Sequence, residues 1–177
     1  MWDKDKALEA ILYLANRIDG PTKMKIFKLL YFADKLHMSK YGRFISGDIY
    51  VAMEHGPVPS RMYDIVKDVQ RGQKSTAFTM PDNKQIIPLR QANLYELSQT
   101  DIECLEETLH ILGHLTAPQL RDRSHSSAWN TMTDNGKMFK NNTASKSVPI
   151  PLELIVEELP NASEVKETLQ REGKMPK

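Results

Sequence analysis

The chain has 177 residues, of which 40% are apolar and 27% charged, with 24 basic and 23 acidic side chains and a net charge of +1. This near-average composition excludes a globally disordered chain, a fibrous repeat and a disulfide scaffold. The balanced charge gives no strong field to attract nucleic acid or an anionic membrane. A single cysteine and a charged N-terminal stretch without a signal-peptide pattern predict a cytoplasmic protein that does not partner a membrane.

The first forty residues predict two helices. Residues 3–18 place apolar side chains at helical spacing, and Asp3 is suited to cap them. Thr22 is suited to cap a second helix over about 23–39, whose apolar side chains point almost all the way round. Such a helix is normally enclosed by its neighbours, so we place it at the centre of the fold. Its remaining polar sector holds Lys25, Lys28 and Lys35. This basic stripe predicts a solvated or partner-facing edge.

The next segment predicts short strands and a third helix. Residues 44–46 and 49–53 are typical of two short strands separated by Gly47. The stretch 55–59 contains two prolines and is expected to be irregular, because proline removes a donor and restricts the residue before it. Ser60 is expected to cap a third helix.

The second half of the chain predicts a hairpin and two capped helices. The segment Pro81-Asp82-Asn83 is typical of a hairpin turn. Thr100 and Glu103 stand at capping-box spacing, and Thr116 and Gln119 repeat that spacing before a short helix.

The C-terminal region carries weaker signals. Residues 133–149 are polar and predict a long loop, and residues 150–159 form a last apolar element. Residues 160–177 have few apolar anchors and predict a marginal helix or a flexible tail, so residues 1–159 are assigned to one domain. The expected fold is α+β and mainly helical: a compact single domain with a buried central helix and a small antiparallel sheet element.

Candidate catalytic patterns are weak. His110 and His114 lie one helical turn apart and could hold a metal ion, but the zinc-peptidase glutamate after the first histidine is absent. Ser124 and His125 have nucleophile-triad chemistry, yet adjacency does not make their side chains converge. Cys104 lies among acidic residues, which disfavour a thiolate, so an ordinary partly buried thiol is expected. The residues predict no enzyme, no cofactor and no metal site.

One set of segments is more specific when taken together. It comprises KLLYFAD at 28–34, YGR at 41–43, ISGDIYVA at 45–52, HGPVP at 55–59, SH at 124–125 and AW at 128–129. This set resembles the Panacea domain, the family of SocA-like antitoxins that also occur as phage-associated proteins. Its motif residues are Tyr31, Asp34, Tyr41, Gly42, Gly47, Asp48, Ala52, Gly56, Val58, Ser124, His125 and Trp129. Their chemistry predicts structural roles, since aromatic groups supply packing area and glycines allow special backbone shapes.

The resemblance implies an antitoxin of a bacterial or phage toxin–antitoxin pair. Its partner is then a cognate toxin protein, which it neutralises by direct contact. The alternative that the family implies is an adaptor that delivers the toxin to a Clp-type protease. A metal-dependent enzyme at His110 and His114 and a nucleic-acid regulator are weaker alternatives, and nucleic acid is not an expected partner.

The partner-binding surface is expected around the entry to the third helix, because prolines stiffen this segment and polar side chains flank it. The candidates are His55, Pro57, Pro59, Arg61 and Tyr63, with Lys25, Lys28 and Lys35 as the charge complement. Aromatic and arginine side chains are the usual anchors of such interfaces.

Overall fold

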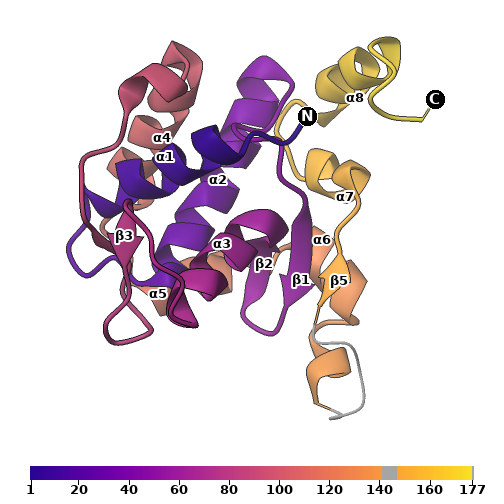
Figure 1. Ribbon diagram of the computed structural model, residues 1–177. Coiled ribbons are helices and arrows are strands. Elements are labelled where there is room, and N and C mark those ends of the chain that lie inside the picture. The colour runs from indigo at the N-terminus through magenta and orange to yellow at the C-terminus, as the bar shows by residue number, and fades with distance from the viewer. Residues whose placement is uncertain (141–146, 177) are drawn as a thin grey trace.

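The computed structural model of the chain describes residues 1–140 and 147–176, and this part forms a mainly helical α+β fold (Figure 1). The α-helices are α1 (Lys4–Ala15), α2 (Lys23–Tyr41), α3 (Ser60–Gln70), α4 (Gln99–Leu112), α5 (Ala117–Ser124), α6 (Ser127–Thr133), α7 (Leu152–Glu157) and α8 (Ala162–Arg171). The strands are β1 (Tyr50–Met53), β2 (Gly56–Pro59), β3 (Phe78–Thr79), β4 (Ile87–Pro88) and β5 (Val148–Pro149). Two 3-10 turns are η1 (Leu94–Glu96) and η2 (Lys137–Phe139). None of the helices in these residues is long and apolar enough to cross a membrane.

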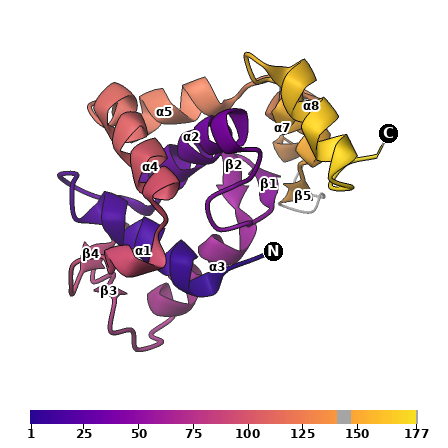
Figure 2. The ribbon, with the colours of Figure 1, turned by 90° about the horizontal axis from the view of Figure 1, so that it is seen from above.

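Helix α2 lies at the centre of the fold, which confirms the interpretation of its all-round apolar pattern. Helices α1, α4 and α5 and strand β2 pack around it (Figures 1 and 2). Ile26, Leu29 and Ala33 have no exposed surface. Burying such side chains on several sides of one helix gives about 2 kcal/mol or more for each of the large ones, which makes α2 the main core element.

Helix caps were predicted well where their partners are local. Asp3 accepts a hydrogen bond from the Lys6 amide (3.0 Å), and Thr22 accepts one from the Lys25 amide (3.3 Å). Thr116 and Gln119 form the predicted capping box of α5. These side chains satisfy amides that the first helical turn leaves without partners.

The predicted cap of α4 was wrong by two residues. The helix is capped by Ser98, whose amide donates to the Asp101 carboxylate at 2.8 Å. Thr100 lies within the helix, and Glu103 instead binds Lys40 at 2.9 Å. Capping-box spacing therefore occurs twice here, in the pair Ser98 and Asp101 and in the pair Thr100 and Glu103. The pair that forms the box is the one in which Asp101 also contacts distant residues.

The main sheet has three strands in the order β2-β1-β5, all antiparallel. Val51 of β1 lies opposite Val58 of β2 on one side and Pro149 of β5 on the other. The strand predicted over residues 44–46 is absent: the Ile45 amide donates to a side chain of α2, and the Ser46 carbonyl accepts from the Asp3 amide. Because its backbone groups are bonded to these partners, the segment 44–46 does not pair with a strand of the sheet.

The stretch predicted to be irregular, residues 55–59, instead contains strand β2. This strand is an edge of the sheet and pairs only with β1 among the described strands. The Ser60 amide donates to the Ile49 carbonyl, and amides alternate in direction along a strand, so the nitrogens of Pro57 and Pro59 face away from β1. Edge strands tolerate proline in this orientation because no ladder hydrogen bond is lost.

The remaining predicted elements are partly revised. Strands β3 and β4 form the predicted hairpin, and Asp82 accepts from the Lys84 and Gln85 amides in its turn. The loop predicted over 133–149 contains η2 and β5, and its residues 141–146 lie outside the described part of the chain.

The C-terminal residues contain helix α8, which packs next to α7 at one side of the fold (Figures 1 and 2). Val165 and Leu169, its two apolar anchors, are buried with Met38 of α2 and with Val156 and Leu159. This small cluster attaches α7 and α8 to the central helix.

Candidate functional site

Asp34, in the first motif, fastens the segment after α2 to the core. Its carboxylate is 1% exposed and accepts from the Ile45 amide and the Tyr50 hydroxyl, both at 2.7 Å. Burial raises the pKa of Asp34 to about 6, although these two hydrogen bonds oppose the shift. Asp34 therefore fixes the segment that follows α2.

Asp48 caps helix α3 from outside the helix. Its carboxylate accepts from the Ile49 amide (2.8 Å), the Arg61 amide (3.1 Å) and the Met62 amide (2.9 Å). The prediction that Ser60 caps α3 was wrong, since Ser60 is already the first helical residue. Burial raises the pKa of Asp48 because the carboxylate is withdrawn from water.

Gly47 allows the N-terminal segment to approach closely. Its φ is +68°, and a Cβ at this position would overlap the Met1 carbonyl oxygen. We expect Gly47→Ala to lower the free energy of unfolding by roughly 1 to 3 kcal/mol, from backbone strain plus this overlap. The matched control is Gly20→Ala, because Gly20 has a similar φ of +59° with open space around it. Urea unfolding of both variants tests this, and equal losses would contradict the role of the close approach.

Three motif segments meet where α2, β2 and α5 touch. Lys28 is 1% exposed, and its ammonium donates to the Pro57 carbonyl at 2.7 Å. Burial lowers the pKa of Lys28 to about 7. A Cβ on Gly56 would overlap Ser124 Oγ and stand 2.9 Å from Lys28 Nζ, so this glycine permits the contact. Ser124 Oγ in turn donates to the Arg121 carbonyl at 2.7 Å.

The last motif attaches α6 to the sheet. The His125 ring stacks on the Trp129 ring, with centroids 3.8 Å apart and planes 2° from parallel. The Trp129 indole donates to the Met53 carbonyl at 2.8 Å. Burial lowers the pKa of His125, and the positive charge of Lys28 adds to that effect. The stacking and the indole hydrogen bond together hold residues 125–129 against the sheet.

The structure divides the predicted partner-binding residues into two groups. Lys28, Pro57 and Pro59 are buried, so the interpretation of Lys28 as part of a solvated edge was wrong. The basic stripe is not continuous because the side chain in its middle turns into the core toward β2. Lys35 is partly exposed and pairs with Glu158 at 2.7 Å. The side chains at the surface or partly exposed are Lys25, His55, Arg61 and Tyr63.

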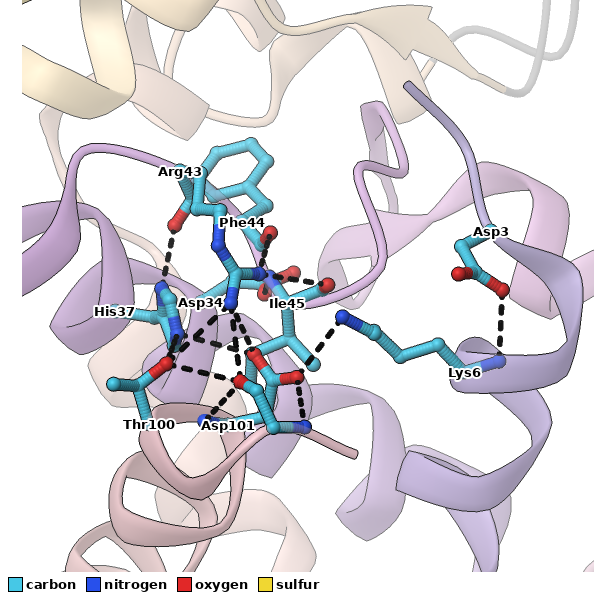
Figure 3. A network of polar contacts seen from close by, with 10 residues as sticks. Asp3, Lys6, Asp34, His37, Arg43, Phe44, Ile45, Thr100 and Asp101 are labelled. Carbon is cyan, nitrogen blue, oxygen red and sulfur yellow. Dashed lines mark hydrogen bonds and ion pairs between the residues drawn. The ribbon is translucent and has the colours of Figure 1, made fainter. Parts of the chain in front are cut away.

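A polar network that the sequence did not predict centres on Asp101 (Figure 3). Its fully buried carboxylate pairs with Arg43 at 2.9 Å, Lys6 at 3.1 Å and His37 at 3.1 Å. Burial by itself would raise the pKa of Asp101, but hydrogen bonds from His37, Ser98 and Lys6 outweigh it and hold the pKa well below its usual range. Its charged partners lie far away in sequence, so no local pattern reveals this network.

Beside this network lies an open groove with a volume of about 640 Å³, which we call the seam groove. It lies between the N-terminal segment, the segment 42–50 after α2, and the pair α7–α8. Its lining residues are Met1, Asp3, Lys6, Met38, Gly42, Arg43, Phe44, Ile45, Gly47, Asp48, Ile49, Tyr50, Ile150, Leu152, Ile155, Leu169 and Lys174. It thus combines motif residues with residues from both ends of the chain.

The weak catalytic candidates lie apart from this groove. His110 and His114 are exposed, and the described residues hold no group of three or more histidine, cysteine or acidic side chains placed to bind a metal ion. Cys104 is fully buried rather than partly buried, and burial raises its thiol pKa to about 11, with acidic neighbours contributing less.

Taken together, the motif residues build a mainly helical α+β domain in which Asp34, Asp48 and Ser124 are bonded to the chain itself, whereas the buried Nε2 of His125 has no hydrogen-bond partner. The family model described as "Antitoxin SocA-like, Panacea domain" matches residues 26–130, which is more than half of the chain. The chain therefore belongs to this family, and the resemblance of its motifs is confirmed. The match begins within α2 and ends within α6. Searches of curated proteins and of solved structures gave no match.

Proposed function

We propose that the chain is the antitoxin of a toxin–antitoxin pair and neutralises a cognate toxin by direct protein–protein binding. The observation that carries this proposal is its membership of the SocA-like antitoxin family over residues 26–130. We place this action in the bacterial cytoplasm, for a pair borne by a chromosome or a phage. Neutralisation by contact needs an interface of ordinary size, about 1,600 Å² in total.

The roles of the motif residues support a binding protein rather than an enzyme. Asp34 and Asp48 accept backbone amides, and Lys28 donates to a backbone carbonyl. Groups that are buried and bonded in this way fix the backbone and are withdrawn from an incoming substrate. They make a rigid frame, which lowers the entropy cost of binding a partner on its surface.

The partly or fully exposed members of the predicted interface remain the proposed toxin contacts. Arg61 lies over the Trp2 ring at 5.5 Å, and Tyr63 packs on Phe27 with ring centroids 6.0 Å apart. His55 is exposed in the turn between β1 and β2. Tyrosine and arginine side chains held in this way are suited to anchor an interface.

Co-expression with the protein encoded by the adjacent open reading frame tests the proposal. We expect that protein to arrest growth alone, and the chain to restore growth and co-purify with it in hosts with and without Clp protease. The triple variant with alanine at positions 55, 61 and 63 should lose rescue while remaining folded. A harmless neighbour would contradict the antitoxin assignment, and rescue that requires the protease would replace neutralisation by the adaptor role.

A further inference from the structure

We propose that the seam groove binds a segment of the toxin in which an apolar side chain stands next to a carboxylate. This inference rests on the proposed function and specifies the chemistry of the partner. Four features of the groove carry it: its apolar surface and volume, its exposed cations, the origin of its walls and the way its family-side wall is held.

The groove offers apolar surface to a partner side chain. Phe44 and Leu152 line it and are each partly exposed, and Ile49 at its edge is 52% exposed. Beneath them Ile150 and Ile155 are buried and form a floor. The volume of about 640 Å³ lies within the roughly 300–1,000 Å³ of protein sites that bury a compact ligand. One or two apolar side chains fit such a space.

Two cations, Lys6 and Arg43, line the groove and contribute through their charge, because the Nη groups of Arg43 already donate to the Phe44 and Ile45 carbonyls and to Ser98, Thr100 and Asp101. The Lys6 and Arg43 side chains are 19% and 39% exposed, whereas their shared partner Asp101 is fully buried. Figure 3 shows both cations reaching Asp101 from opposite sides. Asp48 also lines the groove, but it is 2% exposed and its oxygens are bonded to backbone amides.

The two other charged lining residues have partners nearby. Lys174 is 56% exposed and pairs with the exposed Glu172 at 2.7 Å. Asp3 is exposed and accepts the Lys6 amide at the start of α1, where the helix dipole offsets its charge. Two partly exposed cations over one buried carboxylate therefore favour an incoming acidic group.

The walls of the groove come from two different parts of the chain. The segment 42–50 lies within the span that matches the family, whereas α7, α8 and the N-terminal residues lie outside it. A segment bound here contacts both the family frame and elements that lie outside the matched span. The groove is thus placed to contribute to the choice of toxin.

The family-side wall is fixed before any partner arrives. Asp34 holds Ile45 and Tyr50, and Asp48 ties Ile49 to the start of α3. Surfaces organised in advance bind with a smaller loss of conformational entropy. The groove therefore needs no rearrangement of segment 42–50 to accept a peptide segment.

The test uses the full chain and the purified toxin from the adjacent open reading frame. The groove variant is Ile49→Asp with Lys174→Glu, because both side chains are more than half exposed. The matched control is Leu89→Asp with Lys74→Glu, which makes an equivalent apolar-to-Asp and Lys-to-Glu change at a separate hollow of about 490 Å³ beside β3. Circular dichroism and urea unfolding establish that both variants are folded.

Titration calorimetry should give at least about a tenfold weaker Kd for the groove variant, equal to about 1.4 kcal/mol, and a change below about twofold for the control. Overlapping peptides of the toxin should yield a binding segment whose affinity falls when its Asp or Glu is changed to Asn or Gln.

If the groove variant binds the toxin as tightly as the wild type does, this inference alone is overturned. Absence of toxin binding by the wild type would overturn the proposed function with it. A dimer abolished by the groove variant would assign the groove to a second copy instead.

Discussion

Asp48→Ala is expected to destabilise the protein by roughly 3 to 4 kcal/mol, because a buried carboxylate that accepts three backbone amides is removed. The amides of Ile49, Arg61 and Met62 then lose their acceptor. The start of α3 loses its cap, and the segment 42–50 loses its attachment to that helix. A loss of this size is a large fraction of the usual stability of a domain, about 5 to 15 kcal/mol. Urea unfolding at neutral pH measures it.

The matched variant is Asp48→Asn, which keeps one carbonyl oxygen and the shape of the side chain. Since burial raises the pKa of Asp48, the neutral amide also avoids the cost of a buried charge. The NH2 group of Asn then faces an amide donor, so we expect Asp48→Asn to lose less stability than Asp48→Ala but to keep only part of the cap. Equal losses of stability in the two variants would contradict the role of a side-chain oxygen at position 48 as the acceptor that caps α3.

Lys28→Met is expected to remove a pH dependence of stability that the wild type shows above neutral pH. Burial lowers the pKa of Lys28 to about 7, against an ordinary value of 10.5. Between these two values the unfolded chain holds a proton on Lys28 that the folded chain has released. Stability therefore rises with pH across this window, with a slope that approaches about 1.4 kcal/mol per pH unit.

The contribution of Lys28 to the free energy of unfolding is thus most favourable above its pKa in the unfolded chain. This contribution is lost as the pH falls toward its pKa in the folded chain. Between about pH 7 and about pH 9 the wild type should gain roughly 2 to 3 kcal/mol relative to Lys28→Met. The lost hydrogen bond to the Pro57 carbonyl adds an offset that does not depend on pH. Guanidinium unfolding at several pH values separates the two effects.

Lys25→Met is the matched control, because Lys25 lies on the same helix and is partly exposed. Its pH profile should follow that of the wild type. If Lys28→Met also kept the wild-type slope, the buried ammonium would not be the source of the dependence.

The features predicted from the sequence are those with local causes. The caps at Asp3 and Thr22 depend on amides three residues away, and helical spacing alone identified α2 as the central helix. Packing and capping of this kind repeat at short range, so one sequence is enough to find them.

The features that were missed depend on tertiary contacts. Lys28 lies in a polar sector of its helix, yet β2 covers that sector and supplies the carbonyl of Pro57. The cap of α3 is Asp48, which lies well before the helix. Asp101 joins residues from α1 and from the end of α2. The seam groove likewise combines three separated segments, so neither its existence nor its charge follows from any one of them.

The central claim is neutralisation by direct contact, and titration of the purified chain into the purified toxin tests it most directly. The toxin's own activity is followed in a reaction that contains no protease. We predict that inhibition becomes complete at a fixed molar ratio and that the toxin stays intact within the complex. Full toxin activity at an excess of the chain, despite rescue of growth in cells, would contradict neutralisation by binding.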